Sequence, residues 1–270
     1  MIKHGLLLGM MLGLSACAGA PKVGVAQTMA WEEGRLASQE MARAVAREDI
    51  SAAYTLAQTA LKAFQKLDQV REVNQLRLDL ASLALRLQRP KDAAAWLAAV
   101  SPVAREADPA LALEWAIRKM SVAIQEQQWA QAQAILTTAQ QACVAPCTRQ
   151  LTLDIFKARL AFAQQDWHTA RAVLDRVLAQ TPRPRSGEYA NAARLRAHVA
   201  LRQPLATDAP EDDLRFALEV DQQLGRSDRI AEDLEGLAQW AALKGRHEAA
   251  QDYRQRAMDT RKAASVNLTP

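Results

Sequence analysis

A nine-residue segment that occurs twice constrains the fold of this chain more than any other feature. The sequence QWAQAQAIL at residues 128–136 recurs at residues 166–174 as the similar DWHTARAVL. In both copies a Trp is followed by Ala three residues later, by Leu after seven, and by Ala or Val after ten. These positions share one face of an α-helix, where the small residues admit a neighbouring helix and the Leu fills the gap. The repetition therefore predicts two equivalent packed helices.

An alanine at the same place in this pattern recurs along the whole chain. These marker alanines are Ala53, Ala93, Ala132, Ala170 and Ala250. The first four follow one another at nearly equal intervals, and the step from Ala170 to Ala250 spans two such intervals. A fixed repeat of about 40 residues, with each unit a helix pair, is typical of an α-solenoid. The composition agrees, because Ala and Leu dominate, aromatic residues make up 5%, and glycine is rare. We therefore expect an all-α fold, an α-solenoid of about six antiparallel helix pairs over residues 31–264.

Helical periodicity and short polar turns predict where the helices lie, and no alternation typical of strands is found. The expected pairs are 29–47 with 50–66, 69–88 with 91–100, two pairs that contain the Trp segments, 187–202 with 211–224, and 227–244 with 247–262. The acidic run at residues 211–213 favours a helix start, where negative charge meets the positive end of the helix dipole. Residues 265–270 are expected to be a disordered tail.

The repeat unit resembles the tetratricopeptide repeat (TPR). The resemblance depends on the small–large–small stripe, on Trp129, Trp167 and His247 three residues before the marker alanine, and on Pro182 five residues after Val177. It covers roughly residues 31–262 and implies a curved stack whose first helices line a concave face. The repeat is longer than the unit usual for that family, so a related solenoid of helix pairs is the alternative. The two Trp residues are expected to be hydrophobic fillers between helices rather than a platform for stacking bases or sugars.

The N-terminal segment has the pattern of a secretory leader. Lys3 and His4 precede a short apolar run that ends near Ala16, and this run is too short to span a bilayer. Leu14-Ser15-Ala16-Cys17 resembles a bacterial lipobox, and an ordinary leader with an incidental Cys is the alternative. The resemblance implies that residues 1–16 are a lipoprotein signal peptide, that Cys17 is lipidated, and that residues 17–30 are a flexible tether.

The residue after the lipidated Cys bears on location. Ala18 stands where an Asp retains many Gram-negative lipoproteins at the inner membrane. The resemblance therefore implies an outer-membrane protein, lipid-anchored and facing the periplasm. Each buried CH₂ of an acyl chain contributes about 0.8 kcal/mol, and several chains together make anchoring stable.

Cys143 and Cys147 flank a Val-Ala-Pro segment between two repeats. In an oxidising compartment, thiols this close are expected to form a disulfide. So short a loop contributes only about 2 kcal/mol to stability. Redox catalysis is disfavoured because the spacing is Cys-x3-Cys, and a metal site because no further His or Cys ligands lie nearby in the sequence.

The sequence offers little support for catalysis or nucleic-acid binding. The net charge of +4 is spread over interspersed acidic and basic residues, which favours solvated helix faces over a nucleic-acid footprint. The histidines share no metal-ligand spacing, and no known hydrolase or phosphate-binding motif occurs. We therefore expect no enzyme activity, no cofactor, no metal and no small-molecule substrate.

The remaining expectation is a binding role. The resemblance to repeat-containing lipoproteins implies a scaffold for a protein or peptide on the concave face, in envelope, pilus or outer-membrane assembly. Candidate contact residues on the first helices are Arg118, Gln125, Arg159 and Arg194, because arginine is a frequent interface anchor. The alternatives are a cell-wall-associated enzyme or peptidoglycan-binding protein with an unrecognised site, and a structural tether that self-associates.

Overall fold

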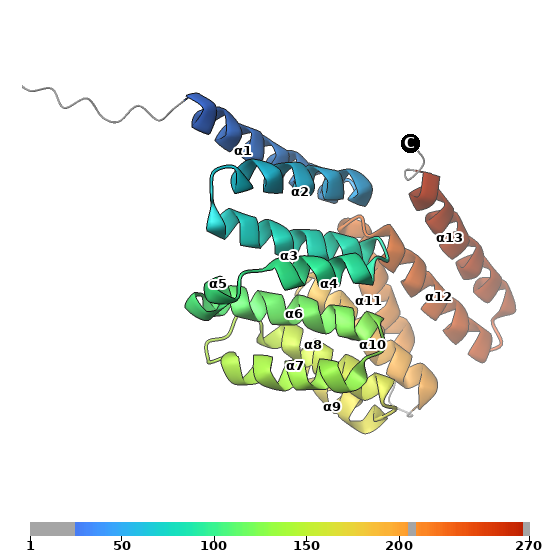
Figure 1. Ribbon diagram of the computed structural model, residues 1–270. Helices are drawn as coiled ribbons and strands as arrows, with labels where there is room; N and C mark the ends of the chain where they lie inside the picture. Colours follow the sequence, from blue (N-terminus) through green and yellow to red (C-terminus); the bar gives the residue numbers. More distant parts are fainter. Residues whose placement is uncertain (1–24, 205–208, 267–270) are drawn as a thin grey trace, which may run out of the picture.

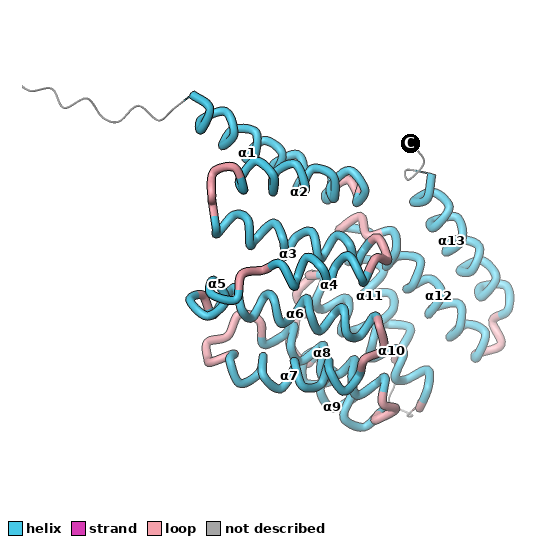
Figure 2. Tube along the Cα trace, in the orientation of Figure 1, coloured by secondary structure: helices cyan, strands magenta, loops and turns pink. Residues whose placement is uncertain are grey.

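The computed structural model describes residues 25–204 and 209–266, which form thirteen α-helices and no strand (Figures 1 and 2). The helices are α1 (Val25–Ala46), α2 (Ile50–Gln65), α3 (Val70–Arg86), α4 (Pro90–Ala99), α5 (Pro102–Ala107), α6 (Pro109–Gln125), α7 (Trp129–Ala142), α8 (Gln150–Ala163), α9 (Trp167–Leu178), α10 (Gly187–Arg202), α11 (Pro210–Gln223), α12 (Ser227–Leu243) and α13 (His247–Val266). The all-α prediction is confirmed.

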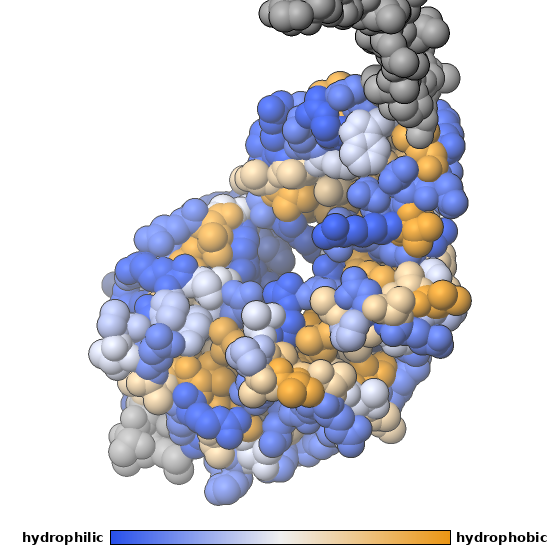
Figure 3. All heavy atoms as spheres, turned by 90° about the vertical axis from the view of Figure 1, so that its left-hand side faces the viewer, coloured by the Kyte–Doolittle hydropathy of each residue, from blue (hydrophilic) through white to orange (hydrophobic). Residues whose placement is uncertain are grey.

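The helices pack as successive pairs, which confirms the α-solenoid. The first helices are α1, α3, α6, α8, α10 and α12, and each packs against the second helix that follows it, namely α2, α4, α7, α9, α11 and α13. First helices of neighbouring pairs also contact one another at α3–α6, α8–α10 and α10–α12. The stack curves, so that in the view of Figure 1 the fainter helices α10–α13 lie farther from the viewer than α1–α7. Figure 3 shows the molecule hollowed at its centre, with hydrophilic and hydrophobic residues both around the hollow.

The marker alanines are the points of close contact that the repeat predicts. Ala53, Ala93, Ala132 and Ala170 have no exposed surface and Ala250 has 1%. In α2, α4, α7 and α9 the marker alanine lies four residues after the residue that caps the N-terminus of the helix. Asp213 occupies this position in α11, four residues after the capping Ala209, and it is also buried. All six pairs are therefore built on one plan, with a carboxylate in place of the methyl group in the fifth.

Seven of the turns between helices share one backbone conformation. Each contains a residue with positive φ, namely Glu48, Asp68, Gln88, Gln127, Gln165, Gly225 and Gly245. The next residue donates its N–H to the carbonyl five residues earlier, as in Asp49 to Ala44 and Asp166 to Ala161, both at 2.9 Å. This is the Schellman arrangement that ends a helix in a left-handed residue. Its repetition gives successive helices the same reversal.

Three boundaries differ from the sequence-based expectation. Helix α1 begins at Val25 rather than at residue 29, because residues 25–30 contain no proline or glycine to interrupt a helix. Helix α5 was not expected, and it forms because Ser101 caps its N-terminus before Pro102. Helix α13 extends to Val266, inside the expected tail. The predicted signal peptide and Cys17 lie outside the described residues.

No helix within the described ranges is both long enough and apolar enough to cross a membrane.

Candidate partner-binding groove

Two adjoining cavities form a groove across the first helices of the later pairs. The larger, of about 310 Å³, is lined by Ile117, Thr152, Ile155, Phe156, Arg159, Gly187, Glu188, Asn191 and Arg226. The smaller, of about 90 Å³, is lined by Ile155, Arg159, Asn191, Arg194, Leu195, His198, Arg229 and Glu232. Ile155, Arg159 and Asn191 line both cavities, which makes the groove continuous. Its walls come from α6, α8, α10 and the start of α12.

One wall of the groove is apolar. Ile155 and Phe156 on α8 are each 7% exposed, and Ile117 on α6 is partly buried in the same region. Ile155 also belongs to the core formed by α8, α9 and α10, whereas Phe156 belongs to the core of α6, α7 and α8. These side chains are held by packing behind them, so the wall is rigid and offers apolar surface to a ligand.

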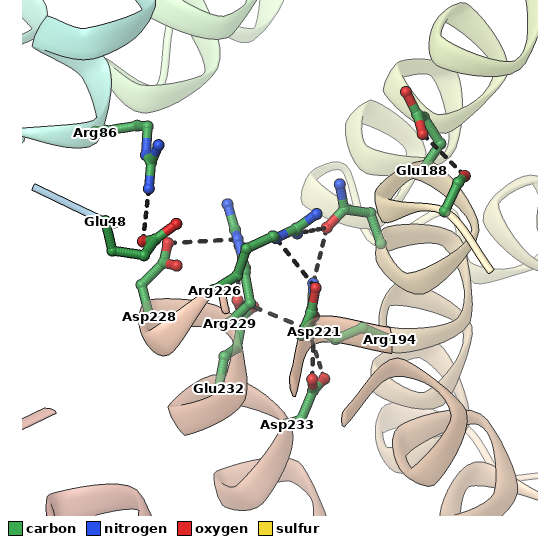
Figure 4. Close-up of polar contacts among 12 residues, drawn as sticks. Glu48, Arg86, Glu188, Arg194, Asp221, Arg226, Asp228, Arg229, Glu232 and Asp233 are labelled. Atoms are coloured by element: carbon green, nitrogen blue, oxygen red, sulfur yellow. Dashed lines mark hydrogen bonds and ion pairs between the residues drawn. The ribbon is translucent and has the colours of Figure 1, made fainter. Parts of the chain in front are cut away.

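The floor beside this wall is a cluster of buried charges that joins α10, α11 and α12 (Figure 4). The guanidinium of Arg194 donates to both oxygens of Asp233, at 2.7 and 3.2 Å, and to Asp221. The carboxylates of Asp221 and Asp233 have no exposed surface. Because the charges are paired inside the protein, this cluster fixes three helices relative to one another.

A second ring of contacts extends the cluster to the groove surface. Arg226, in the turn before α12, lies with Nε 3.1 Å from Asp221, and its Nη2 donates to Asn191 Oδ1 at 3.1 Å. Gly187 makes this path possible, because a Cβ there would collide with Nη1 of Arg226. On α12, Arg229 pairs with Glu232 at 2.6 Å.

Burial and neighbouring charges shift the pKa values of several groove groups. Burial, with the nearby negative charge of Asp221, raises the pKa of Asp233 even though Arg194 opposes the shift. Burial also lowers the pKa of His198, and the positive charges of Arg194 and Arg202 lower it further. His198 is therefore neutral near pH 7. The positive charges of Arg229 and Arg194 lower the pKa of Glu232 against its burial, which keeps that carboxylate ionised.

Two of the four predicted contact residues are hydrogen-bonded to the preceding helix pair and lie outside the groove. Arg118 donates through Nε to the carbonyl of Leu78 and to Ser82 on α3, and pairs with Glu114 on its own helix. Gln125 donates to Gln88 Oε1 at 2.6 Å, in the turn of the preceding pair. Neither lines the groove. Their donors are used in holding α6 against the earlier repeat.

The other two predicted residues do line the groove, in different ways. Arg194 is 3% exposed and its guanidinium is held by Asp221, Asp233 and Asn191, so its donors are used inside the protein. Arg159 lines both cavities and is exposed. Of the four, Arg159 alone both faces the groove and keeps its side chain available for a ligand.

The remaining sequence-based candidates lie elsewhere in the stack. Cys143 and Cys147 form a disulfide in the segment between α7 and α8, with their Cα atoms 5.4 Å apart. Trp129 and Trp167 are partly buried and pack in the cores of their pairs, Trp167 edge-on to Phe162 with ring centroids 5.1 Å apart. They are fillers between helices, as predicted. In the part of the chain that the structure describes, no group of three His, Cys, Asp or Glu side chains is placed to hold a metal ion.

Sequence reasoning missed most of the groove. It did not single out Asn191, Arg226, Arg229 or the apolar wall at Ile155 and Phe156. The apolar residues carry the same helical periodicity as core positions, so the sequence gives no signal that part of their surface faces a groove. Gly187 was a usable signal, since a glycine at a helix start often marks close approach by another group.

No known protein-family model matches this chain, and no curated protein sequence matches it either.

Proposed function

We propose that this protein is a lipid-anchored periplasmic scaffold, related to tetratricopeptide-repeat lipoproteins, that binds a segment of a partner protein in the groove. The observation that carries the proposal is the make-up of the groove. Side chains from four successive first-helix segments, α6, α8, α10 and the start of α12, contribute to one continuous surface with an apolar wall and free polar groups. Such a surface suits an extended chain that contacts several repeats at once.

The anchoring part of the proposal depends on the sequence. The lipobox-like Leu14-Ser15-Ala16-Cys17 supports lipidation at Cys17, and Ala18 supports retention at the outer membrane on its periplasmic side. The role that follows is to hold a partner near the membrane during envelope, pilus or outer-membrane assembly. The stack provides the binding surface, and the lipid provides the location.

Photo-crosslinking inside cells tests the binding role. A photoreactive amino acid is placed at Thr152 or Glu188, which line the groove, and at Arg254, an exposed position on α13, as control. We expect both groove positions to capture the same protein and the control position not to capture it. Equal capture at all three positions, or none in the groove, would contradict the proposal. Release of soluble fragments from cell-wall sacculi by the purified protein would favour the enzyme alternative instead.

Fractionation tests the anchor. Cys17→Ser removes the sulfur that would carry the lipid, so we expect this variant to leave the membrane fraction without detergent. The unmodified chain should require detergent for release. A wild-type protein that washes off membranes with salt alone would show that it is not lipid-anchored.

A further inference from the structure

One arginine in the groove carries a charge that the protein does not neutralise. Within residues 25–204 and 209–266, the guanidinium of Arg159 takes part in no hydrogen bond and no ion pair, and its carbon Cζ lies 5.9 Å from the centre of the Phe156 ring. The other groove arginines differ, because Arg229 is paired with Glu232 and Arg226 with Asp221. Among the described residues, Arg159 is therefore the groove arginine whose charge has no ion-pair partner.

The surroundings of Arg159 favour an incoming negative charge. Arg159 is exposed as a residue, but the groove walls displace water from around its guanidinium, and this desolvation lowers its pKa. The positive charges of Arg229 and Arg194 lower the pKa further, while Glu232 opposes them. The guanidinium is therefore partly desolvated and has no ion-pair partner among the described residues. A carboxylate placed against it would restore hydrogen bonds to an ion in a partly desolvated site, where charge-assisted bonds are strongest.

The neighbouring Asn191 is oriented as a hydrogen-bond donor. Its Oδ1 accepts from Arg194 Nη1 at 2.9 Å and from Arg226 Nη2 at 3.1 Å. Because both partners are cations with only donors to offer, the oxygen must face them and the Nδ2 amide must face away. Asn191 lines both cavities. Among the described residues, Nδ2 of Asn191 donates to no protein acceptor and is not a buried unsatisfied atom, so its N–H groups are free to bond a ligand in the groove that Asn191 lines.

We propose that Arg159 and Asn191 select a partner segment in which an acidic side chain stands next to a large apolar one. Arg159 pairs with the acidic side chain, Asn191 donates to a backbone carbonyl, and the wall of Ile117, Ile155 and Phe156 receives the apolar side chain. Arg194 is a positioning residue that acts through Asn191. This inference rests on the proposed function and adds the chemistry of the bound segment.

The groove favours a peptide over a glycan strand. Its apolar wall has no donors or acceptors to match a row of sugar hydroxyls, and burying hydroxyls there without partners costs free energy. An extended peptide presents the required combination, since a carbonyl, a carboxylate and an apolar side chain lie within neighbouring residues. A cavity of about 310 Å³ is large enough to receive such a side chain.

Selection from a random peptide library displayed on phage tests the inference. We expect peptides retained by the wild-type protein to be enriched in Asp or Glu beside Leu, Ile, Val or Phe. A synthetic peptide with the enriched sequence should bind Arg159→Gln about tenfold more weakly, as expected when one charge-assisted pair is lost. Arg254→Gln, which removes an exposed arginine from α13, is the matched control and should bind like wild type.

The variant Asn191→Asp tests the donor role of the Asn191 side chain without disturbing the fold. The new carboxylate still accepts from Arg194 and Arg226, so the charge cluster and the thermal unfolding midpoint should be retained. The groove side then carries an acceptor in place of a donor, so binding of the same peptide should fall at least about tenfold. Unchanged affinity in Asn191→Asp, unchanged affinity in Arg159→Gln, or enrichment without acidic residues would each overturn the inference.

The outcomes also distinguish this inference from the proposed function. If the groove crosslinks a protein in cells but the library gives no acidic motif, the function stands and the inference fails. If neither experiment captures a polypeptide, both fail. If wild type but not Arg159→Gln pellets with sacculi while no peptide is enriched, the groove binds a glycan polymer and the peptide inference is overturned.

Discussion

At the scale of single residues, the fifth repeat shows why a regular pattern can be hidden in the sequence. Asp213 replaces the marker alanine there, and its carboxylate is held by Arg196 at 2.7 Å through two nitrogens and by Arg183 at 2.8 Å. An unpaired carboxylate could not occupy a site of close helix contact. The double interval between Ala170 and Ala250 therefore reflects a substitution that distant arginines made possible, which the one-dimensional pattern does not reveal.

The buried charge cluster leads to a prediction about stability. Arg194→Met leaves Asp233 without a cation, since the other arginine of the cluster pairs with Asp221. We expect a loss of about 3–5 kcal/mol in the free energy of unfolding, measured by urea denaturation, because removing one partner of a buried ion pair leaves the other without its hydrogen bonds and forces it to take up a proton. The double variant Arg194→Met/Asp233→Asn should recover a large part of this loss. A single variant within about 0.5 kcal/mol of wild type, the range of ordinary surface substitutions, would contradict the role of the cluster.

Glu211 leads to a prediction about pH. It accepts hydrogen bonds from Arg246 at 2.8 Å, Arg215 at 2.9 Å and Trp240 at 3.1 Å. The bonds from Arg246 and Arg215 lower the pKa of Glu211 from 4.5 to about 2. Because the folded pKa lies below the unfolded one, this stabilisation is present above pH 4.5 and disappears as the pH falls towards 2.

Glu211→Gln tests this pH dependence. At pH 7 we expect the variant to be less stable by about 1 kcal/mol, a discounted value because water reaches the side chain and screens the charges. The difference should shrink steadily below pH 4.5, as measured by denaturant unfolding at a series of pH values. Glu219→Gln, whose partner Arg185 is half exposed, is the control and should change stability little at any pH. A difference that is constant with pH would contradict the linkage.

At the scale of helices and turns, the sequence predicts the elements well and the connections poorly. The ends of α10, α12 and the start of α13 fall within a residue of their expected positions, because capping residues, glycines and polar gaps are local signals. The left-handed turn residues are less predictable, since five of the seven are not glycine. Helix α5 was missed because a six-residue helix carries too little periodicity to detect.

The turns give a third prediction. Gln127 and Gln165 adopt φ values of 59° and 60°, a conformation that costs an L-residue roughly 1 kcal/mol and costs glycine almost nothing. We therefore expect Gln127→Gly and Gln165→Gly each to raise the free energy of unfolding by about 0.5–1 kcal/mol. Thermal and urea unfolding of the single and double variants measure the gain.

The reverse substitution, from glycine to a residue with a Cβ at an equivalent turn position, is Gly245→Ala. Gly245 has φ of 70°, and no atom lies within 4 Å of the position that a Cβ would occupy, so its substitution tests backbone conformation without steric contact. We expect a loss of about 1 kcal/mol. If the glycine variants are destabilised, or if Gly245→Ala is neutral, left-handed strain does not account for these turns.

At the scale of the whole molecule, the solenoid was predictable and the groove was not. A regular repeat of helix pairs is specified by local sequence patterns and by packing between neighbouring repeats, and both can be recognised from the sequence. The groove needs side chains from four helix segments to meet after the stack curves. Asn191 shows the difficulty, because its orientation depends on Arg226, 35 residues away. Of the four contact residues named from the sequence, Arg159 alone lines the groove without an ion pair among the described residues.

The linear architecture gives the last prediction. Within residues 25–204 and 209–266, the pair α1–α2 has a neighbouring pair on one side, and α12–α13 likewise, whereas α8–α9 lies between two pairs. In a stack stabilised by nearest-neighbour contacts, the end pairs lose fewer contacts on opening and open more often. Native-state hydrogen exchange should therefore show faster exchange of the buried amides in α1–α2 and α12–α13 than in α8–α9. Because α12 supplies Arg229 and Glu232 to the groove, ligand binding should slow exchange in α12 more than in α1. Uniform exchange across all pairs would instead mean that the curved stack unfolds as one cooperative unit.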